Sequence, residues 1–208
     1  MKKLLIFGAG GFGCEAFTIA KDVGYSIVGF VDSKCSESLP ALLLGSDHDI
    51  EKIIASHKDV MGFVAIGNSL LRKKVSEDMK NKGIEIVSLV HPTSLIAEDV
   101  SIGEGAIIYP NVTIMNSSKI SKGALINSNV SIGHDVCVGE FSNVNLGANL
   151  AGCVQVGDCT LIGMGANVIE GNRIGNDVTI GAGAVVTKNL IEKGVYLGIP
   201  AIKRGSND

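Results

Sequence analysis

The chain has 208 residues, of which 46% are hydrophobic and 19% are charged. This composition is typical of a globular protein and excludes a disordered one. Because the formal net charge is only −3 at pH 7, neither nucleic acid nor an anionic membrane is expected as a partner.

The N-terminal segment MKKLLIFGAGGFG predicts a first strand, not a signal peptide. Its apolar run covers only Leu4 to Phe7, and a glycine loop follows at once. No stretch approaches the ~18 apolar residues that a bilayer-spanning helix needs. We therefore expect a cytoplasmic protein with free thiols and no membrane insertion.

Strand-like and helix-like segments alternate over residues 1–88. Alternation of this kind predicts a parallel sheet with crossover helices, here a Rossmann-like half domain. Strands are predicted at Lys3–Phe7, Ser26–Val31, Val60–Ile66 and Ile84–Leu89, and helices at Phe12–Val23, His48–His57 and Leu70–Lys82.

The period of the sequence changes at Val90. From there an Ile, Val or Leu occupies every sixth position as far as Val186. Two places before each of these, from Ile102 onward, stands a small or β-branched residue, with Asn172 as the one departure. A six-residue unit is a short strand plus a turn, and three units close a triangular coil with the aliphatic side chains inside. An unbroken six-residue spacing argues against a β-sandwich, which would show two-residue alternation and variable loops.

These features together resemble the hexapeptide-repeat acyltransferases. The GAGGFG start, the AIGN segment (Ala65–Asn68), the GHD within the repeats (Gly133–Asp135) and the terminal G-x-P-A (Gly198–Ala201) are similar to the sialic-acid O-acetyltransferase-like subfamily. That subfamily includes enzymes that N-acetylate nucleotide-linked 4-amino sugars. The resemblance implies a left-handed parallel β-helix over residues 89–208, a nucleotide-sugar-binding domain over 1–88, and a homotrimer.

Gly8, Gly10 and Gly13 form a G-x-G-x-x-G pattern between a predicted strand and helix, and Asp32 ends the next strand. Such glycines let a diphosphate approach the helix N-terminus, while the acid holds a ribose hydroxyl. A dinucleotide needs two such halves, and the repeats begin before a second could be completed. One nucleoside diphosphate is therefore expected, and an NAD-dependent oxidoreductase is the alternative.

The resemblance implies which residues hold the nucleotide sugar. They are the glycine loop, the turn after the second strand and the AIGN segment: Gly8, Gly10, Gly11, Phe12, Asp32, Ser33 and Gly67. Many relatives have His where this chain has Phe12, so a polar contact is not expected there.

His134 occupies the third place of its hexad, which faces outward, and Asp135 follows it. Acetyl transfer requires a base that deprotonates the attacking group, and imidazole exchanges protons near neutral pH. The predicted mechanism makes His134 the general base and Asp135 the residue that orients it. Relatives often have Glu at the place of Asp135. The other histidines, His48, His57 and His91, are expected to be solvated or structural.

The resemblance also implies an acetyl-CoA groove between the β-helices of neighbouring subunits. Matching positions are Asn143, Gly152, Met164 and Ala182, with the Gly198–Lys203 tail closing over the cofactor. A backbone N–H near Gly152 is expected to stabilise the tetrahedral oxyanion. Some relatives have His at the place of Asn143.

The five cysteines contain no CxxC pair, which argues against a zinc or redox motif. Cys153 and Cys159 are one hexad apart and lack histidine partners at that spacing, so no metal is expected. Cys137 could suggest an acyl-cysteine intermediate, but a structural thiol is the favoured interpretation.

The sequence thus predicts an acetyl-CoA-dependent N-acetyltransferase acting on the amine of a nucleotide-linked 4-amino sugar in surface glycan biosynthesis. A sugar O-acetyltransferase of the sialic-acid type is the nearest alternative. A non-catalytic nucleotide-sugar-binding protein is the alternative from another class.

Overall fold

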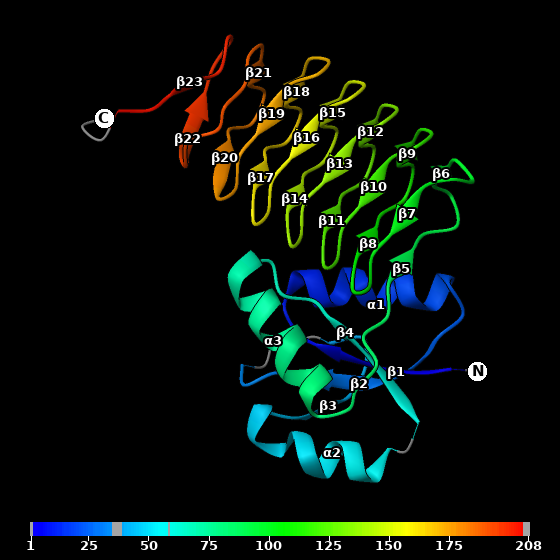
Figure 1. Cartoon of the computed structure of the whole chain (residues 1–208). Coiled ribbons are helices and arrows are strands. Elements are labelled where there is room, and N and C mark those ends of the chain that lie inside the picture. Colours follow the sequence, from blue (N-terminus) through cyan, green and yellow to red (C-terminus); the bar gives the residue numbers. More distant parts are fainter. Residues whose placement is uncertain (1, 35–38, 58, 206–208) are drawn as a thin grey trace. The chain divides into compact units, whose positions relative to one another are not determined.

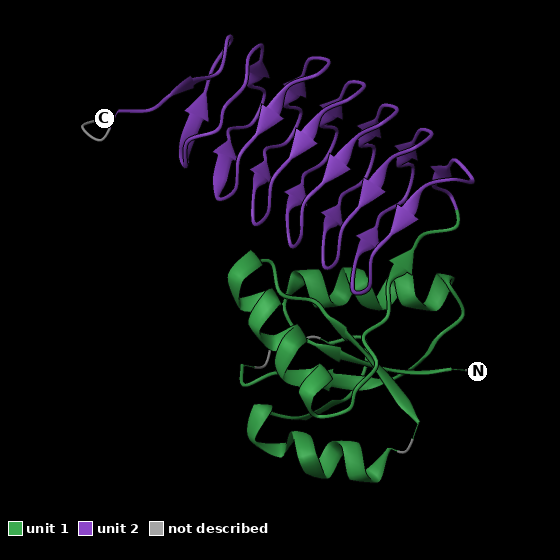
Figure 2. Cartoon of the chain, in the orientation of Figure 1, with its two compact units in different colours: residues 1–92 green, residues 93–208 purple. Residues whose placement is uncertain are grey.

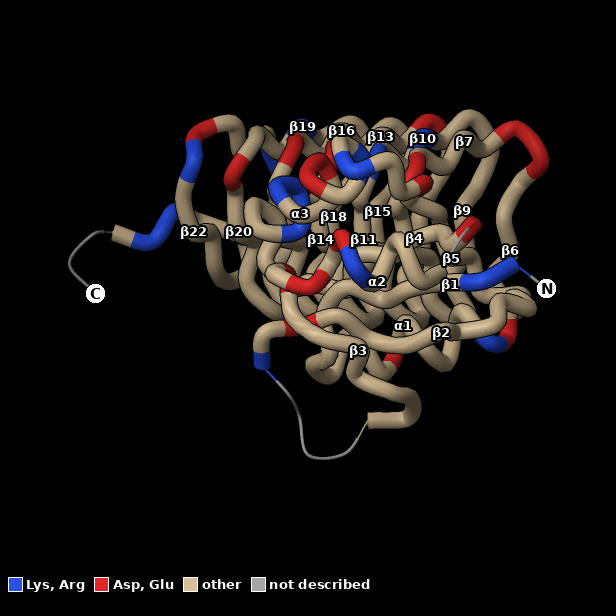
Figure 3. Tube along the Cα trace, turned by 90° about the horizontal axis from the view of Figure 1, so that it is seen from below, with Lys and Arg blue, Asp and Glu red and all other residues tan. Residues whose placement is uncertain are grey.

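The computed structural model describes residues 2–34, 39–57 and 59–205. The chain divides into two compact units, Met1–Pro92 and Thr93–Asp208 (Figure 2). Figure 1 shows the helices confined to the first unit and stacked short strands in the second. Lys and Arg are interspersed with Asp and Glu along both units (Figure 3).

Unit 1 is a parallel sheet with helices. Its strands follow the order β3-β2-β1-β4, and every pairing is parallel. Apolar side chains of β1 and β4, including Leu5 and Val64, pack with Ile53 and Met79 from the helices. The elements are β1 (Lys3–Phe7), α1 (Gly11–Asp22), β2 (Ser26–Val31), β3 (Leu43–Gly45), the 3₁₀ turn η1 (Asp47–Asp49), α2 (Ile50–Ser56), β4 (Val60–Val64), α3 (Ser69–Asn81) and β5 (Leu89–Val90).

Two predicted details of unit 1 were wrong. Strand β3 was not expected; it pairs with β2 where Gly29 lets the Leu42 carbonyl approach closely. The predicted strand Ile84–Leu89 is reduced to a single bridge between Ile86 and Gly62, followed by β5. Both segments are too short and irregular to show a clear period.

Unit 2 is a prism of three parallel sheets, which we call faces 1, 2 and 3. Each strand from β6 to β18 pairs with the strand eighteen residues further on, as Lys119 does with Cys137 and Ser131 with Asn149, whereas β20 pairs with β22 sixteen residues on. Face 1 comprises β6 (Leu95–Ile96), β9 (Thr113–Ile114), β12 (Ser131–Ile132), β15 (Asn149–Leu150), β18 (Asn167–Val168) and β21 (Val185–Val186). Face 2 comprises β7 (Ser101–Ile102), β10 (Lys119–Ile120), β13 (Cys137–Val138), β16 (Gln155–Val156) and β19 (Arg173–Ile174).

Face 3 contains β8 (Ile107–Ile108), β11 (Leu125–Ile126), β14 (Asn143–Val144), β17 (Leu161–Ile162) and β20 (Val178–Ile180), and continues into β22 (Gly194–Leu197). The last strand, β23 (Ile202–Lys203), pairs antiparallel with β22. The predicted architecture, a Rossmann-like α/β unit followed by a parallel β-helix, is confirmed. Among the residues that the structure describes, no helix is both long and apolar enough to cross a membrane.

The six-residue pattern has a direct physical counterpart. The aliphatic positions from Ile108 to Val186 are buried, and so are the small positions from Ala106 to Ala184. Asn172 is also buried, and its amide donates to the carbonyl of Ile169 at 2.9 Å, which explains how a polar residue is tolerated there. At each corner one residue has a positive φ, a conformation that favours Gly, Asn and Asp. Non-glycine residues adopt it at Asn111, Ser117, Asn129, Asp135, Phe141, Cys153, Cys159 and Asp177.

Candidate active site

The GHD turn lies on the prism edge between faces 1 and 2, where the chain passes from β12 to β13. Asp135 takes the left-handed corner position, with φ 57°. Its Oδ2 lies 2.7 Å from Nδ1 of His134, and the two side chains are 60% and 58% exposed. A proton on Nδ1 donated to the carboxylate leaves Nε2 of the neutral imidazole as the acceptor.

Gly152 stands directly beside the imidazole, one coil further along the same edge. A Cβ at position 152 would lie only 2.5 Å from Nε2 of His134. The coils are aligned here by a 2.8 Å hydrogen bond from Cys153 N to the His134 carbonyl. Within the described part of the chain, the Gly152 N–H has no hydrogen-bond partner. The Gly152 N–H is therefore available as a backbone donor on the same edge as the predicted base.

Cys153 is a neighbour of His134 and Asp135 that the sequence reasoning missed. One ligand atom from each of His134, Asp135 and Cys153 lies within 4.8 Å of the others. The six-residue spacing between Cys153 and Cys159 does not indicate this contact. The relevant offset is nineteen residues, one full coil plus one, which brings Cys153 beside His134.

The glycine loop connects β1 to α1, and the AIGN segment follows β4. Because β1 and β4 are neighbours in a parallel sheet, both loops lie at the same edge of unit 1. Gly8 has φ 111°, and a Cβ there would lie 2.5 Å from the Ala65 carbonyl oxygen. Around Gly10, Gly11 and Gly67 an added Cβ would meet nothing within 4 Å. The glycines thus serve two purposes. Gly8 allows two backbone segments to pack closely, whereas the other three leave exposed backbone that a ligand can approach.

The remaining predicted nucleotide-binding residues surround this loop. Asp32 Oδ2 accepts a 2.7 Å hydrogen bond from Ala9 N, so the acid braces the glycine loop. Ser33 is exposed. The Phe12 ring packs edge-to-face against Phe63, with centroids 6.1 Å apart, in place of a polar contact. The buried Arg72 donates from Nη1 to the carbonyl of Ile66 at 2.7 Å and to that of Gly67 at 3.1 Å, which fixes the AIGN loop.

The four predicted acetyl-CoA residues do not come together in one chain. Gly152 shares the edge of His134, whereas Met164 and Ala182 lie on the edge between faces 3 and 1. Asn143 belongs to β14 on face 3 and is 9% exposed. Met164 is exposed, as are the apolar side chains of Leu146 on the same edge and Ile199 in the tail.

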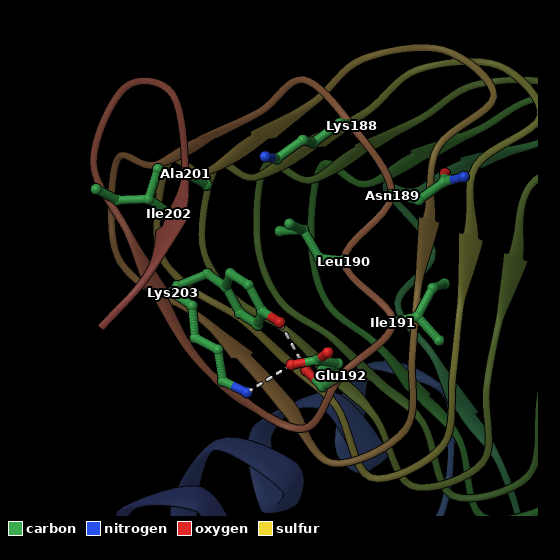
Figure 4. A pocket seen from close by; sticks show the side chains of 9 residues that line it. Lys188, Asn189, Leu190, Ile191, Glu192, Ala201, Ile202 and Lys203 are labelled. Carbon is green, nitrogen blue, oxygen red and sulfur yellow. Dashed lines mark hydrogen bonds and ion pairs between the residues drawn. The ribbon is translucent and has the colours of Figure 1, made fainter. Parts of the chain in front are cut away.

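The C-terminal tail continues the edge between faces 3 and 1. Val185 N donates to the Gly198 carbonyl at 3.1 Å, and Ala201 N to the Val185 carbonyl at 2.7 Å. A hollow of about 390 Å³ lies at this end of the prism. Figure 4 shows Lys188, Leu190 and Ile191 on its wall, with Lys203 bonded to Glu192 at 3.0 Å. The bond to Glu192 raises the pKa of Lys203.

A second hollow lies on face 1 and is mostly apolar. Its volume is about 480 Å³. It extends to Gly133 and Ala151, the residues that immediately precede His134 and Gly152. The strand positions around it include two asparagines, Asn149 and Asn167, which are joined by a 2.9 Å amide hydrogen bond. Face 1 thus joins the edge of His134 to the edge of Met164.

The glycine loop on an α/β unit and the outward imidazole on a hexapeptide β-helix are thus both present, as the resemblance to the hexapeptide-repeat acyltransferases implied. Residues 3–79 match the PglD N-terminal domain family. This match covers most of unit 1 and places it with that domain family.

Two curated relatives are similar over part of their length. UDP-N-acetylbacillosamine N-acetyltransferase of Bacillus subtilis (strain 168) is 26% identical over 111 residues, 52% of this chain and 51% of the relative. GDP-perosamine N-acetyltransferase of Escherichia coli O157:H7 is 33% identical over 124 residues, 50% of this chain and 49% of the relative. Each match thus spans about half the length of the curated relative.

Similarity to solved structures extends over nearly the whole chain. PerB from Caulobacter crescentus, in complex with CoA and GDP-perosamine, has a TM-score of 0.93 and 29% identity, covering 99% of this chain and 98% of that one. The acetyltransferase domain of PglB from Neisseria gonorrhoeae FA1090, in complex with acetyl coenzyme A, has a TM-score of 0.90 and 27% identity, covering 98% and 99%.

Proposed function

We propose that this protein transfers the acetyl group of acetyl-CoA to the amine of a nucleotide-linked 4-amino sugar. The observation that carries the proposal is the 2.7 Å contact between His134 and Asp135 on the solvent-facing edge, with Gly152 beside the imidazole. The relatives named as N-acetyltransferases of UDP- and GDP-linked sugars support an amine acceptor.

The proposed chemistry is direct attack. Nε2 of His134 takes a proton from the sugar amine as its nitrogen attacks the thioester carbonyl, and Asp135 stabilises the imidazolium that forms. The Gly152 N–H donates to the oxygen of the tetrahedral intermediate. Collapse of the intermediate breaks the C–S bond, releases CoA thiolate and leaves an amide on the sugar. His134 then returns its proton to the thiolate.

The proposed nucleotide site is the open side of the glycine loop. Gly10 and Gly11 leave room for the diphosphate at the N-terminus of α1, where the helix dipole favours negative charge. Asp32 retains lone pairs for a ribose hydroxyl besides those used by Ala9 N and Lys34 N. PerB, crystallised with GDP-perosamine, supports a nucleotide-sugar ligand of this class.

We also propose that acetyl-CoA binds between two copies of this chain within a homotrimer. Met164, Ala182 and the Gly198–Ala201 tail follow one edge of the prism, while His134 and Gly152 follow another. A thioester can meet both sets when a second copy packs on face 1, which has an apolar hollow beside the catalytic edge. The exposed apolar side chains of Leu146, Met164 and Ile199 suit the pantetheine arm.

The test is incubation of the purified chain with acetyl-CoA and a panel of UDP-, dTDP-, GDP- and CMP-linked sugars. Thiol release measures turnover, and mass spectrometry of the product locates the acetyl group. An acetyl amide on a nucleotide 4-amino sugar is the expected product. A base-labile ester on a hydroxyl would support the O-acetyltransferase alternative, and the absence of transfer to any acceptor would contradict the proposal. Thermal stabilisation by NAD but by no nucleoside diphosphate would favour an oxidoreductase.

A further inference from the structure

The edge that carries His134 presents three different metal-ligand types. His134 and Asp135 come from one coil and Cys153 from the next, and one ligand atom of each lies within 4.8 Å of the others. All three residues are exposed, so an ion can reach them and their side chains can rotate. The backbone is fixed beneath them, because Cys153 N is bonded to the His134 carbonyl at 2.8 Å.

We propose that this cluster binds Zn²⁺ and that the bound ion inhibits the enzyme. Zinc takes imidazole nitrogen, thiolate sulfur and carboxylate oxygen at about 2.0–2.3 Å in a tetrahedral arrangement. Small rotations of exposed side chains bring the three atoms to those distances, and water fills the fourth place. Binding displaces a proton from the Cys153 thiol. It also occupies the imidazole that acts as base, so acetyl transfer stops while zinc is bound.

The chain contains a matched control for this site. Cys153 and Cys159 are one hexad apart and both occupy the left-handed corner position, with φ 61° and 52°. Cys159 lies on the edge between faces 2 and 3, away from His134. Serine fits this backbone, because Ser117 has the same conformation, with φ 60°. Ser117 lies on the same edge as Asp135, one coil earlier. Cys159→Ser therefore makes the same substitution at the same hexad position but away from the imidazole, at a cysteine that is half-buried where Cys153 is exposed.

The experiment is a titration of the full chain with Co²⁺, whose thiolate complexes absorb in the near ultraviolet, followed by displacement with Zn²⁺. We expect a charge-transfer band that Cys159→Ser retains and Cys153→Ser loses. In the acetyl-transfer assay, zinc should inhibit the wild type reversibly, with a chelator restoring activity. Cys153→Ser should require roughly tenfold or more zinc for the same inhibition. A band or an inhibition constant unchanged by Cys153→Ser would overturn the proposal, and the spectrum tests binding whether or not the acceptor sugar is known.

A second inference rests on a buried hydroxyl beneath the catalytic turn. Ser118 is 2% exposed. Its Oγ donates to the Gly133 carbonyl at 2.9 Å and accepts from Val136 N at 3.1 Å. These two groups flank His134 and Asp135, so a single side chain ties the two ends of the turn together.

The same hydroxyl bridge occurs twice more on the edge between faces 2 and 3. Ser142 donates to the Gly157 carbonyl at 2.6 Å and accepts from Thr160 N at 2.9 Å. Thr160 donates to the Gly175 carbonyl at 2.7 Å and accepts from Val178 N at 3.2 Å. Neither of these turns carries a histidine. The hydroxyl bridge is thus a recurring hydrogen-bond pattern of this prism, and Ser118 forms it at the turn that contains His134.

We infer that Ser118 is a positioning residue, an inference that rests on the proposed function. By holding the 133–136 turn, it keeps Nε2 of His134 at the place where the substrate amine is deprotonated. A displacement of about 1 Å at such a group can reduce the rate by as much as ~10²-fold.

The experiment compares Ser118→Ala with Ser142→Ala. Both remove one buried bridge, so we expect similar decreases in Tm. Only Ser118→Ala should lower kcat, by roughly tenfold or more, with KM for both substrates nearly unchanged. Ser118→Thr should restore kcat, because Thr160 makes the same bridge. If alanine unfolds the prism, Ser118→Val serves in its place, since Val136 and Val154 stand at the equivalent hexad position.

Equal kcat for the two alanine variants, or a threonine variant as slow as alanine, would overturn the positioning role. A wild-type chain with no acetyl transfer to any acceptor would instead contradict the proposed function. The two failures are therefore distinguishable.

Discussion

The two units present their functional groups in opposite ways. In the β-helix the coils repeat one backbone arrangement, and the proposed functional groups are side chains on the outside: His134, Asp135 and Cys153 on one edge. In the α/β unit the loops differ from one another, and the proposed ligand-facing positions are marked by missing side chains, as at Gly10, Gly11 and Gly67. In the β-helix, candidate site residues can therefore be recognised as side chains that break the repeat. In the α/β unit, they are recognised as glycines with open space around the backbone.

The largest expected effect on stability comes from Gly8→Ala. Gly8 has φ 111°, and its Cβ would lie 2.5 Å from a backbone oxygen of Ala65 that cannot move aside without shifting β4. We expect a loss of roughly 2–4 kcal/mol in the free energy of unfolding of unit 1. Chemical unfolding of the full chain, followed by circular dichroism, measures it. A variant as stable as wild type would show that the loop does not close in this way.

Gly152→Ala should abolish most activity while leaving the fold intact. The Cβ would stand 2.5 Å from Nε2 of His134 and displace the imidazole. Alanine suits this backbone, because Ala182 occupies the same hexad position. We expect kcat to fall by about 10²-fold, with an unchanged Tm. Glu104→Ala, at the same hexad position on another edge, should retain wild-type kcat. Activity above about a third of wild type in Gly152→Ala would argue against the proposed placement of the base.

Gly11→Ala tests the open side of the glycine loop. No atom lies within 4 Å of the added Cβ, and α1 begins at this residue. The free energy of unfolding should stay the same or rise by about 0.5–1 kcal/mol, because alanine favours helix over glycine. KM for the nucleotide sugar should rise several-fold while KM for acetyl-CoA stays constant. An unchanged sugar KM would exclude this loop from the site.

Asp49→Asn should have the smallest effect. Hydrogen bonds from the backbone N–H and the hydroxyl of Ser46 hold the pKa of Asp49 below its ordinary value. A depressed carboxyl pKa stabilises the fold at neutral pH, and this contribution disappears as pH falls through the folded-state pKa. The variant should therefore melt slightly below wild type at pH 7, with the difference vanishing in acid. A gap that persists at low pH would contradict the assigned cause.

The β-helix could be predicted almost in full from the sequence. The six-residue spacing determines which side chains point inward, and the strands from β6 to β18 pair eighteen residues on, as it predicts. The six-residue spacing also determines which residues follow one another along an edge. Counting eighteen residues per coil therefore predicts that Cys153 lies beside His134. What the spacing could not reveal is the hydroxyl bridge of Ser118, because a serine at a small inward position gives no sign of which carbonyl it will meet.

The α/β unit was less predictable, for a physical reason. The glycine loop and its flanking elements follow from local turn chemistry, and α1 begins within a residue of its predicted start. Strand β3 pairs with β2 where Gly29 lets the Leu42 carbonyl approach closely, a tertiary contact with no local signal. The brace from Asp32 to Ala9 N likewise joins residues far apart in sequence.

The central claim, that His134 acts as the base, is tested most directly by the acetyl-transfer rate of His134→Asn at saturating acetyl-CoA and acceptor. Asparagine keeps a polar side chain at the edge but cannot accept the proton of the amine. We predict that kcat falls by ~10²-fold or more, while KM for both substrates and the circular dichroism spectrum stay close to wild type. Retention of more than about a tenth of the wild-type kcat would contradict the assignment.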